Sequence, residues 1–166
     1  MAARTWFLDF EGYTEPGKYW VKELCILPYG KPEDAGFDQD EHYNYFVKSD
    51  GLKGKRFGPQ SWQLRRHGLE VYFGDYEYDE VIRDVQIKVG NGKVLVKGRE
   101  KANFLKPWFN VEELPEHLCT FKKCQGFMDK CCQVKHGKEF CAKRKCYILR
   151  DAYERYNNQA CKLTCK

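Results

Sequence analysis

The stretch from Cys131 to Cys146 gathers four cysteines and one histidine, His136, within sixteen residues. Thiolate and imidazole are the ligands that Zn²⁺ prefers, and a structural zinc ion takes four of them in a tetrahedron. The order Cys132, His136, Cys141 gives the spacing Cys-x₃-His-x₄-Cys, which is close to known zinc spacings. The stretch therefore predicts a zinc site, with Cys131 or Cys132 as its first thiolate and Cys146 as an alternative ligand.

Two carboxylates near the start of the chain form a second candidate site. Asp9 and Glu11 follow the apolar run from Trp6 to Leu8, and residues two apart project from the same face of a β-strand. Paired carboxylates can hold hard divalent cations such as Mg²⁺ or Mn²⁺. These two are the candidate catalytic residues if the chain is a metal-dependent nuclease. The alternative is that they are solvated acids at a disused site.

The chain has nine cysteines, but the apolar run after Met1 is broken by Asp9 and Glu11, which is unlike a secretory signal. We therefore expect an intracellular protein of the cytoplasm or nucleus, with metal rather than disulfides as the main use of cysteine. No apolar run reaches transmembrane length, so no membrane association is expected. Four further cysteines are candidates for a second zinc site, for disulfides or for free thiols: Cys119, Cys124, Cys161 and Cys165.

The net charge of +5 permits nucleic-acid binding without requiring it. Basic residues gather in two stretches, and Phe57 and Trp62 lie among those of the first. Cations that contact phosphates, interleaved with rings that stack on bases, suit a single strand. A solvated charged surface is the alternative. The candidate nucleic-acid-binding residues are Lys53, Lys55, Arg56, Arg65, Arg66, Lys143 and Arg144.

Apolar periodicity predicts the elements that must position these residues. Hairpin-linked strands come first, and helices that alternate with a strand follow. This order predicts an α/β fold: a mixed sheet with three antiparallel strands and then parallel strands, flanked by helices. We expect one domain over residues 1–156 and a cysteine-containing tail over 157–166. The predicted strands cover 5–10, 19–27, 42–47 and 93–97, with 110–114 a strand or turn, and the predicted helices cover 78–89, 99–109 and 141–156.

A first strand that ends in Asp9-x-Glu11, two further antiparallel strands and a late helix introduced by His-x₄ resemble the DEDD-type 3′–5′ exonucleases of the ribonuclease H-like fold. The resemblance implies two divalent metal ions held by four carboxylates. This chain departs from that pattern twice: Lys101 stands in the register of one acid, and Cys141 stands where an acid should follow His136. Half of the carboxylate set is missing, so we expect the exonuclease reaction to be lost.

The chain is also similar to the Maelstrom domain of animal small-RNA pathways, and segments such as 21–26 and 96–101 are similar to uncharacterised arthropod mobile-element proteins. The Maelstrom domain shares the fold and carries a Glu-Cys-His-Cys zinc site, matched in order here by Glu23, Cys132, His136 and Cys141. The alternative for Glu23 is a salt-bridged strand residue.

These resemblances imply a zinc-stabilised domain that binds single-stranded RNA without two-metal catalysis and acts in or against small-RNA silencing. An active nuclease dependent on Mg²⁺ or Mn²⁺, and a protein-interaction module, are the alternative functions.

Overall fold

The computed structural model describes residues 3–15, 18–31, 33–48, 67–70, 73–132 and 140–164. Five strands form one mixed sheet in the order β3-β2-β1-β4-β5. The first three strands pair antiparallel, and β4 lies parallel to both β1 and β5. The predicted α/β class and the predicted strand directions are therefore confirmed. The strands are β1 (Trp6–Glu15), β2 (Lys18–Pro28), β3 (Tyr43–Phe46), β4 (Lys93–Lys97) and β5 (Asn110–Leu114).

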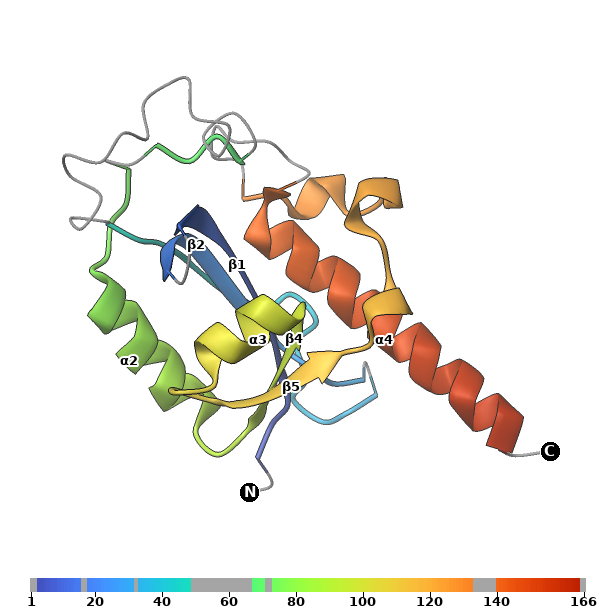
Figure 1. Cartoon of the computed structure of the whole chain (residues 1–166). Helices are drawn as coiled ribbons and strands as arrows, with labels where there is room; N and C mark the ends of the chain where they lie inside the picture. The colour runs from blue at the N-terminus through green and yellow to red at the C-terminus, as the bar shows by residue number, and fades with distance from the viewer. Residues whose placement is uncertain are drawn as a thin grey trace.

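Helices cover both faces of the sheet (Figure 1). One face packs against α2 (Tyr78–Val89) and α3 (Arg99–Leu105), and the other packs against the long helix α4 (Ala142–Thr164). The bounds of α2 and β4 are those predicted from the sequence, because strong apolar periodicity and the turn at 90–92 define both. Three short 3₁₀ helices lead into α4: η2 (Glu116–Leu118), η3 (Phe121–Lys123) and η4 (Met128–Lys130).

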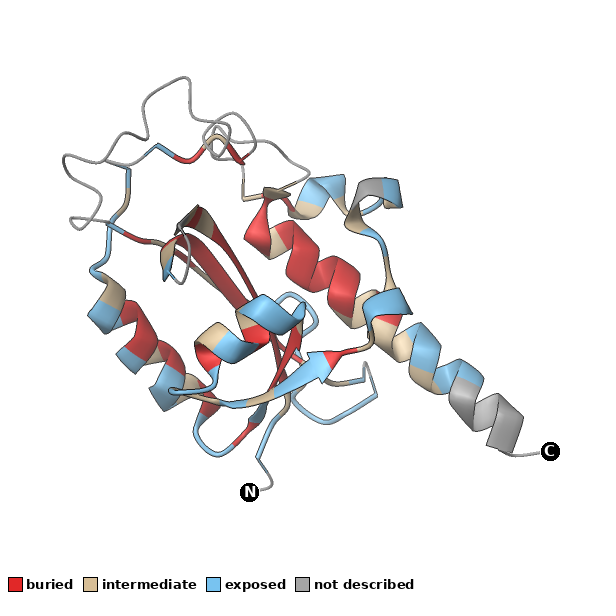
Figure 2. Ribbon diagram, viewed as in Figure 1, coloured by how far each residue is buried: buried red, intermediate tan, exposed pale blue. Residues whose placement is uncertain are grey.

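Side chains along β1 alternate between the two faces. Leu8 and Phe10 enter the core beneath α2 and α3, whereas Phe7 enters the core beneath α4. Asp9 and Glu11 share the face of Phe7 because side chains in a strand repeat every two residues. Both carboxylates are therefore buried under α4. Figure 2 shows that β1 and β2 are largely buried between the helices. The alternative that they are solvated acids is therefore wrong.

The first strand is longer than predicted. Its pairing with β2 shifts register between Glu11 and Gly12 and then continues to Glu15. A Cβ atom at position 12 would lie 1.9 Å from the carbonyl oxygen of Trp20, so this close approach requires glycine. The predicted end at Phe10 was wrong because polar side chains interrupt the apolar run while the backbone remains extended.

Helix α4 is also longer than predicted. It continues past Tyr156 to Thr164, so most of the expected tail over 157–166 is helix. No glycine or proline occurs between these positions, and Asn157 and Asn158 lower helix propensity without breaking a helix. Despite the length of α4, the described part of the chain contains no helix apolar enough to span a membrane.

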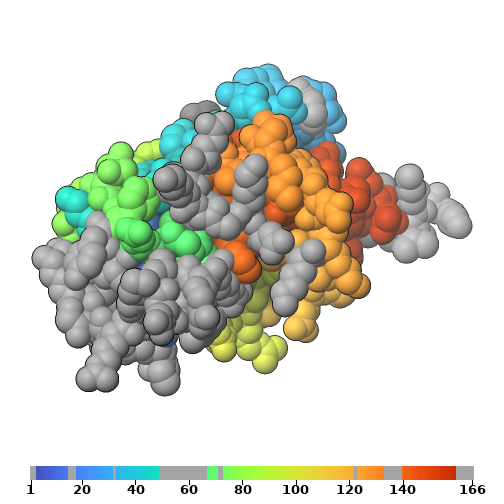
Figure 3. All heavy atoms as spheres, turned by 90° about the horizontal axis from the view of Figure 1, so that it is seen from above, coloured from blue at the N-terminus to red at the C-terminus, as the bar shows by residue number. Residues whose placement is uncertain are grey.

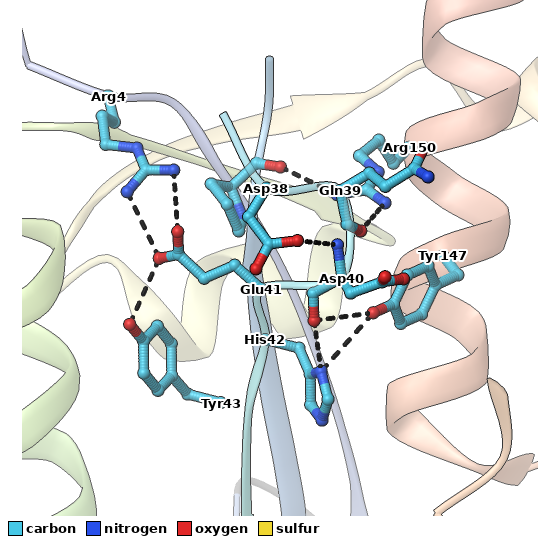
Figure 4. A network of polar contacts seen from close by, with 10 residues as sticks. Arg4, Asp38, Gln39, Asp40, Glu41, His42, Tyr43, Tyr147 and Arg150 are labelled. Atoms are coloured by element: carbon cyan, nitrogen blue, oxygen red, sulfur yellow. Dashed lines mark hydrogen bonds and ion pairs between the residues drawn. The ribbon is translucent and has the colours of Figure 1, made fainter. Parts of the chain in front are cut away.

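A polar network holds the loop after β2 against α4 (Figure 4). Arg150 donates to the carbonyl oxygen of Gln39 at 2.6 Å, and the Tyr147 hydroxyl donates to that of Asp40 at 3.4 Å. The Asp40 carboxylate also pairs with Lys130 of η4 at 3.2 Å. Accordingly, residues 115–132 (orange) lie beside residues 33–48 (cyan) when the molecule is turned (Figure 3).

Lys22 is the only lysine with a fully buried side chain among the described residues. Its Nζ donates to the carbonyl oxygen of Val47 at 2.8 Å and to that of Phe73. Burial lowers its pKa from 10.5 to about 8. This ammonium group therefore ties β2 to two segments that are distant in the sequence.

Replacing Lys22 with methionine should lower the free energy of unfolding by about 2–3 kcal/mol, because two carbonyl groups lose a charged donor. Urea denaturation measures the change. Lys18→Met, at an exposed position of the same strand, is the matched control and should leave stability unchanged. Equal stability of the two variants would contradict this role for Lys22.

Candidate metal centre

Three cysteines meet at the start of α4. The sulfurs of Cys131, Cys132 and Cys141 all lie within 4.8 Å of one another, and those of Cys132 and Cys141 are 3.5 Å apart. Zinc–sulfur bonds of about 2.3 Å in a tetrahedron place ligand sulfurs about 3.8 Å apart. The spacing therefore fits one metal ion, and this cluster is the only group of three such donors among the described residues. We call these three residues the cysteine cluster.

Glu23 reaches the cysteine cluster from β2 and is fully buried. Its Oε2 atom lies 3.7 Å from the sulfur of Cys141, although 118 residues separate the two along the chain. Its Oε1 atom accepts the backbone N–H of Ala142 at 2.8 Å and so caps the first turn of α4. Of the four ligands that the Maelstrom resemblance implies, the structure thus places Glu23 and Cys132 each beside Cys141, although Glu23 is not in the group whose ligand atoms all lie within 4.8 Å of one another. The fourth, His136, lies outside the described residues.

The other cysteines differ in environment. Cys146, the alternative ligand, donates to the backbone oxygen of Cys25 at 3.3 Å inside the core. Burial raises the pKa of both thiols, which favours neutral core groups over metal ligands. Cys119 and Cys124 are half-buried and belong to no group of three donors among the described residues. The side chains of Cys161 and Cys165 lie outside that part of the chain.

The carboxylates of Asp9 and Glu11 meet two lysines instead of metal ions. Lys101 Nζ lies 2.9 Å from Asp9 Oδ1 and 3.7 Å from Glu11 Oε1, and it also donates to the Phe10 carbonyl at 2.7 Å. Lys145 Nζ, from α4, pairs with the same Glu11 oxygen. We call Asp9, Glu11, Lys101 and Lys145 the ion cluster. Two negative and two positive groups balance within it.

Electrostatics keep Lys101 charged within the ion cluster. Burial alone would lower the pKa of Lys101, but the nearby Asp9 and Glu11 carboxylates outweigh it and hold the pKa above 10.5. An ammonium group therefore persists at neutral pH beside both acids. A divalent cation would have to displace it, and only two carboxylates would then remain to bind the ion.

Lys145 is the residue that sequence analysis missed. The expectation placed Cys141 in the register of the lost acid, but Cys141 belongs to the cysteine cluster and Lys145 faces Glu11. Positions four apart lie on one face of a helix, so a helix that buries Cys141 also turns Lys145 towards the sheet. This periodicity is the sequence signal that would have found it.

A groove passes over the ion cluster. Two pockets of about 500 and 530 Å³ adjoin there and share four residues, Lys97, Gly98, Arg99 and Lys101. Glu11 and Tyr19 line the first pocket, whereas Phe121 and Lys145 line the second. The groove thus offers cations and rings to a ligand, together with several carboxylates. The remaining acids that line it are Glu100, Glu113 and Glu116.

The expected nucleic-acid contacts have mixed outcomes. Arg144 is fully buried, and its guanidinium donates to the backbone oxygens of Gly126 at 3.0 Å and Cys124 at 2.7 Å. Its prediction as a nucleic-acid contact was therefore wrong, because the side chain fixes the segment before the cysteine cluster onto α4. Lys143 is half-buried and remains a candidate. The other predicted contacts, Lys53, Lys55, Arg56, Arg65 and Arg66, lie outside the described residues.

Comparison of the chain with protein-family models, curated proteins and solved structures finds no match. The resemblances to DEDD exonucleases and to the Maelstrom domain therefore remain predictions that rest on the residues quoted for them.

We predict that the wild-type protein binds no Mn²⁺ at Asp9 and Glu11, because the two ammonium groups neutralise these acids. The variant Lys101→Asp/Lys145→Asp should gain Mn²⁺ binding, since four carboxylates would then surround the site. Electron paramagnetic resonance, which distinguishes free from bound Mn²⁺, measures binding by the wild-type protein and by the variant.

The matched control is Lys93→Asp/Lys143→Asp, which makes the same charge change outside the ion cluster and should bind no additional Mn²⁺. Tight Mn²⁺ binding by the wild-type protein, lost in Asp9→Ala/Glu11→Ala, would show that the lysines do not fill the site.

Proposed function

We propose that this chain is a zinc-stabilised domain of the ribonuclease H-like type that binds single-stranded RNA and does not cleave it. The observation that carries the proposal is the ion cluster, where two lysines stand beside the two acids of an exonuclease-like first strand. The proposal includes a distant relationship to the DEDD exonucleases and the Maelstrom domain. It also includes a role in or against small-RNA silencing.

The absence of cleavage follows from the requirements of two-metal chemistry. That reaction needs carboxylates that hold two cations, activate water and stabilise the leaving oxygen. Here the charges of Asp9 and Glu11 are balanced by Lys101 and Lys145. An ammonium group can neutralise a carboxylate, but it cannot lower the pKa of a bound water as a metal ion does.

We assign the zinc ion to the cysteine cluster. Cys141 and one or both of Cys131 and Cys132 would supply sulfur. His136 is the nitrogen donor indicated by the cysteine and histidine spacing, and Glu23 is the oxygen donor implied by the resemblance to the Maelstrom domain. The convergence of Glu23 on Cys141 supports this donor set, because no local sequence constraint requires that approach. Zinc would join β2 to the start of α4 and so stabilise the fold.

We predict one zinc ion per chain, with sulfur neighbours at about 2.3 Å in X-ray absorption at the zinc edge. Cys141→Ser should weaken zinc binding by more than about 100-fold, since losing even a partner of a ligand costs about 10–100-fold. Competition with a chromophoric chelator measures the affinity.

Cys124→Ser, a half-buried cysteine outside the cysteine cluster, is the control and should keep wild-type affinity. The sulfur count from X-ray absorption distinguishes two thiolates from three. A folded chain that carries no zinc would contradict this part of the proposal.

RNA binding is supported by the net charge of +5 and by the basic stretch around Lys53 to Arg66, with Phe57 and Trp62 among its cations. Lys97 and Arg99 add cations to the groove over the ion cluster, where Tyr19 and Phe121 add aromatic rings. Phosphates pair with such cations while bases stack on such rings.

We predict that a labelled single-stranded RNA binds with an affinity that falls linearly with salt on logarithmic axes. The variant Lys53→Ala/Lys55→Ala/Arg56→Ala should bind RNA more weakly. The slope of log affinity against log salt concentration should become shallower by about 2, since each phosphate contact contributes about 0.7. Fluorescence anisotropy across a salt series gives both values. The control with the same charge change at exposed positions is Lys31→Ala/Lys93→Ala/Lys106→Ala.

The same samples test the alternative functions. Cleavage of the RNA with Mg²⁺ or Mn²⁺ that disappears in Asp9→Ala/Glu11→Ala would establish an active nuclease. No RNA binding at any salt concentration, together with a co-purified protein, would instead favour an interaction module.

A further inference from the structure

The cysteine cluster and the ion cluster are neighbours on the sheet. Glu11 of β1 lies directly opposite Glu23 of β2 in the antiparallel pairing. Side chains of directly opposed residues have Cβ atoms about 4.5–5.5 Å apart. Glu11 belongs to the ion cluster and Glu23 contacts Cys141 of the cysteine cluster, so the two clusters adjoin at this pair of buried acids.

A single helical turn reaches both clusters. Cys141, just before α4, contributes its sulfur to the cysteine cluster, and Lys145 pairs with Glu11. The backbone N–H of Lys145 donates to the carbonyl oxygen of Cys141 at 3.0 Å, while that of Ala142 donates to Glu23 at 2.8 Å. This turn is therefore fixed at its start by the metal centre and at its end by the ion cluster.

We propose that metal occupancy of the cysteine cluster controls the position of Lys145 on Glu11, and with it the charge that the groove presents to RNA. The proposal rests on the proposed zinc site. A bound divalent ion would tie Cys141, at the start of α4, to Cys131 and Cys132, whereas metal-free cysteines take up protons and lose this tie.

Removal of the ion releases the first turn of α4 from this anchor. Lys145 then leaves Glu11, whose charge faces the groove that Lys145 also lines. Coupling between two sites is reciprocal, so a change at Lys145 must alter zinc affinity by the same factor as zinc alters the Lys145–Glu11 contact.

The reciprocal effect is measured without RNA. Lys145→Met should weaken zinc binding by about 5- to 150-fold, the usual range of such coupling. Lys143→Met, a half-buried lysine in the same turn, should leave zinc affinity unchanged. Wild-type zinc affinity in Lys145→Met, or an equal loss in both variants, would overturn the proposal.

A second measurement uses the wild-type protein and does not depend on the stability of a variant. The Lys145 side chain is 6% exposed and that of Lys101 is 21% exposed. Acylation followed by peptide mass spectrometry should find Lys145 protected in the zinc form and more reactive after chelation, with a smaller change at Lys101. Unchanged reactivity of Lys145 would also overturn the proposal.

The third measurement compares the RNA affinity of the zinc-loaded protein with that of the chelated protein. Tighter binding by the zinc form supports control of the groove. If RNA does not bind at all, the RNA part of the proposed function fails, while the zinc-affinity and acylation results still decide whether Lys145 responds to the metal. A wild-type chain that binds no zinc overturns both proposals.

Discussion

The structure depends on how three buried carboxylates beneath α4 are neutralised. Asp9, Glu11 and Glu23 project from β1 and β2 towards this helix, and each is almost fully buried. An isolated ionised carboxylate in an apolar interior costs far more than a hydrogen bond returns. The first turn of α4 must therefore bring compensating groups to the sheet, and this requirement determines where the helix begins and which face it buries.

Two kinds of chemistry meet that requirement within a few residues of each other. At Glu11, lysine ammonium groups arrive from α3 and α4 and form ion pairs. At Glu23, a backbone N–H and a sulfur arrive from the start of α4. Lysine brings its own fixed charge, whereas thiols become charged when a metal displaces their protons. The lysine pairs need no metal ion, whereas the zinc ion that we propose would add a further positive charge beside Glu23.

This difference between the two sites underlies the proposed function. Lysine side chains occupy the place beside Asp9 and Glu11, and this is the basis of the proposal that the groove above binds RNA without cleaving it. The neighbouring cysteine cluster could hold a metal ion, and the helix that begins there also carries Lys145 of the groove. Under the two proposals, RNA binding and metal occupancy are coupled through one helical turn rather than through a long pathway.

The sequence by itself determined the fold class and pointed to the cysteines of the candidate site. Periodicity predicted α2 and β4 with their observed bounds, and cysteine spacing singled out Cys132 and Cys141, which lie 3.5 Å apart, whereas Glu23 was named only by the resemblance to the Maelstrom domain. Periodicity and ligand type are informative because they are local properties that each residue carries with it.

Only the tertiary structure decided what each charge faces. It buried Arg144, paired Lys145 with Glu11 and placed Asp9 and Glu11 beneath a helix instead of in water. Such partners are separated by up to 134 residues in sequence, and their meeting depends on strand register and helix rotation. A one-residue change in strand register would turn the same side chains to the opposite face, and a one-residue shift along a helix would rotate them by about 100°. Local patterns therefore indicate which residues share a face, but not which distant partner each one meets.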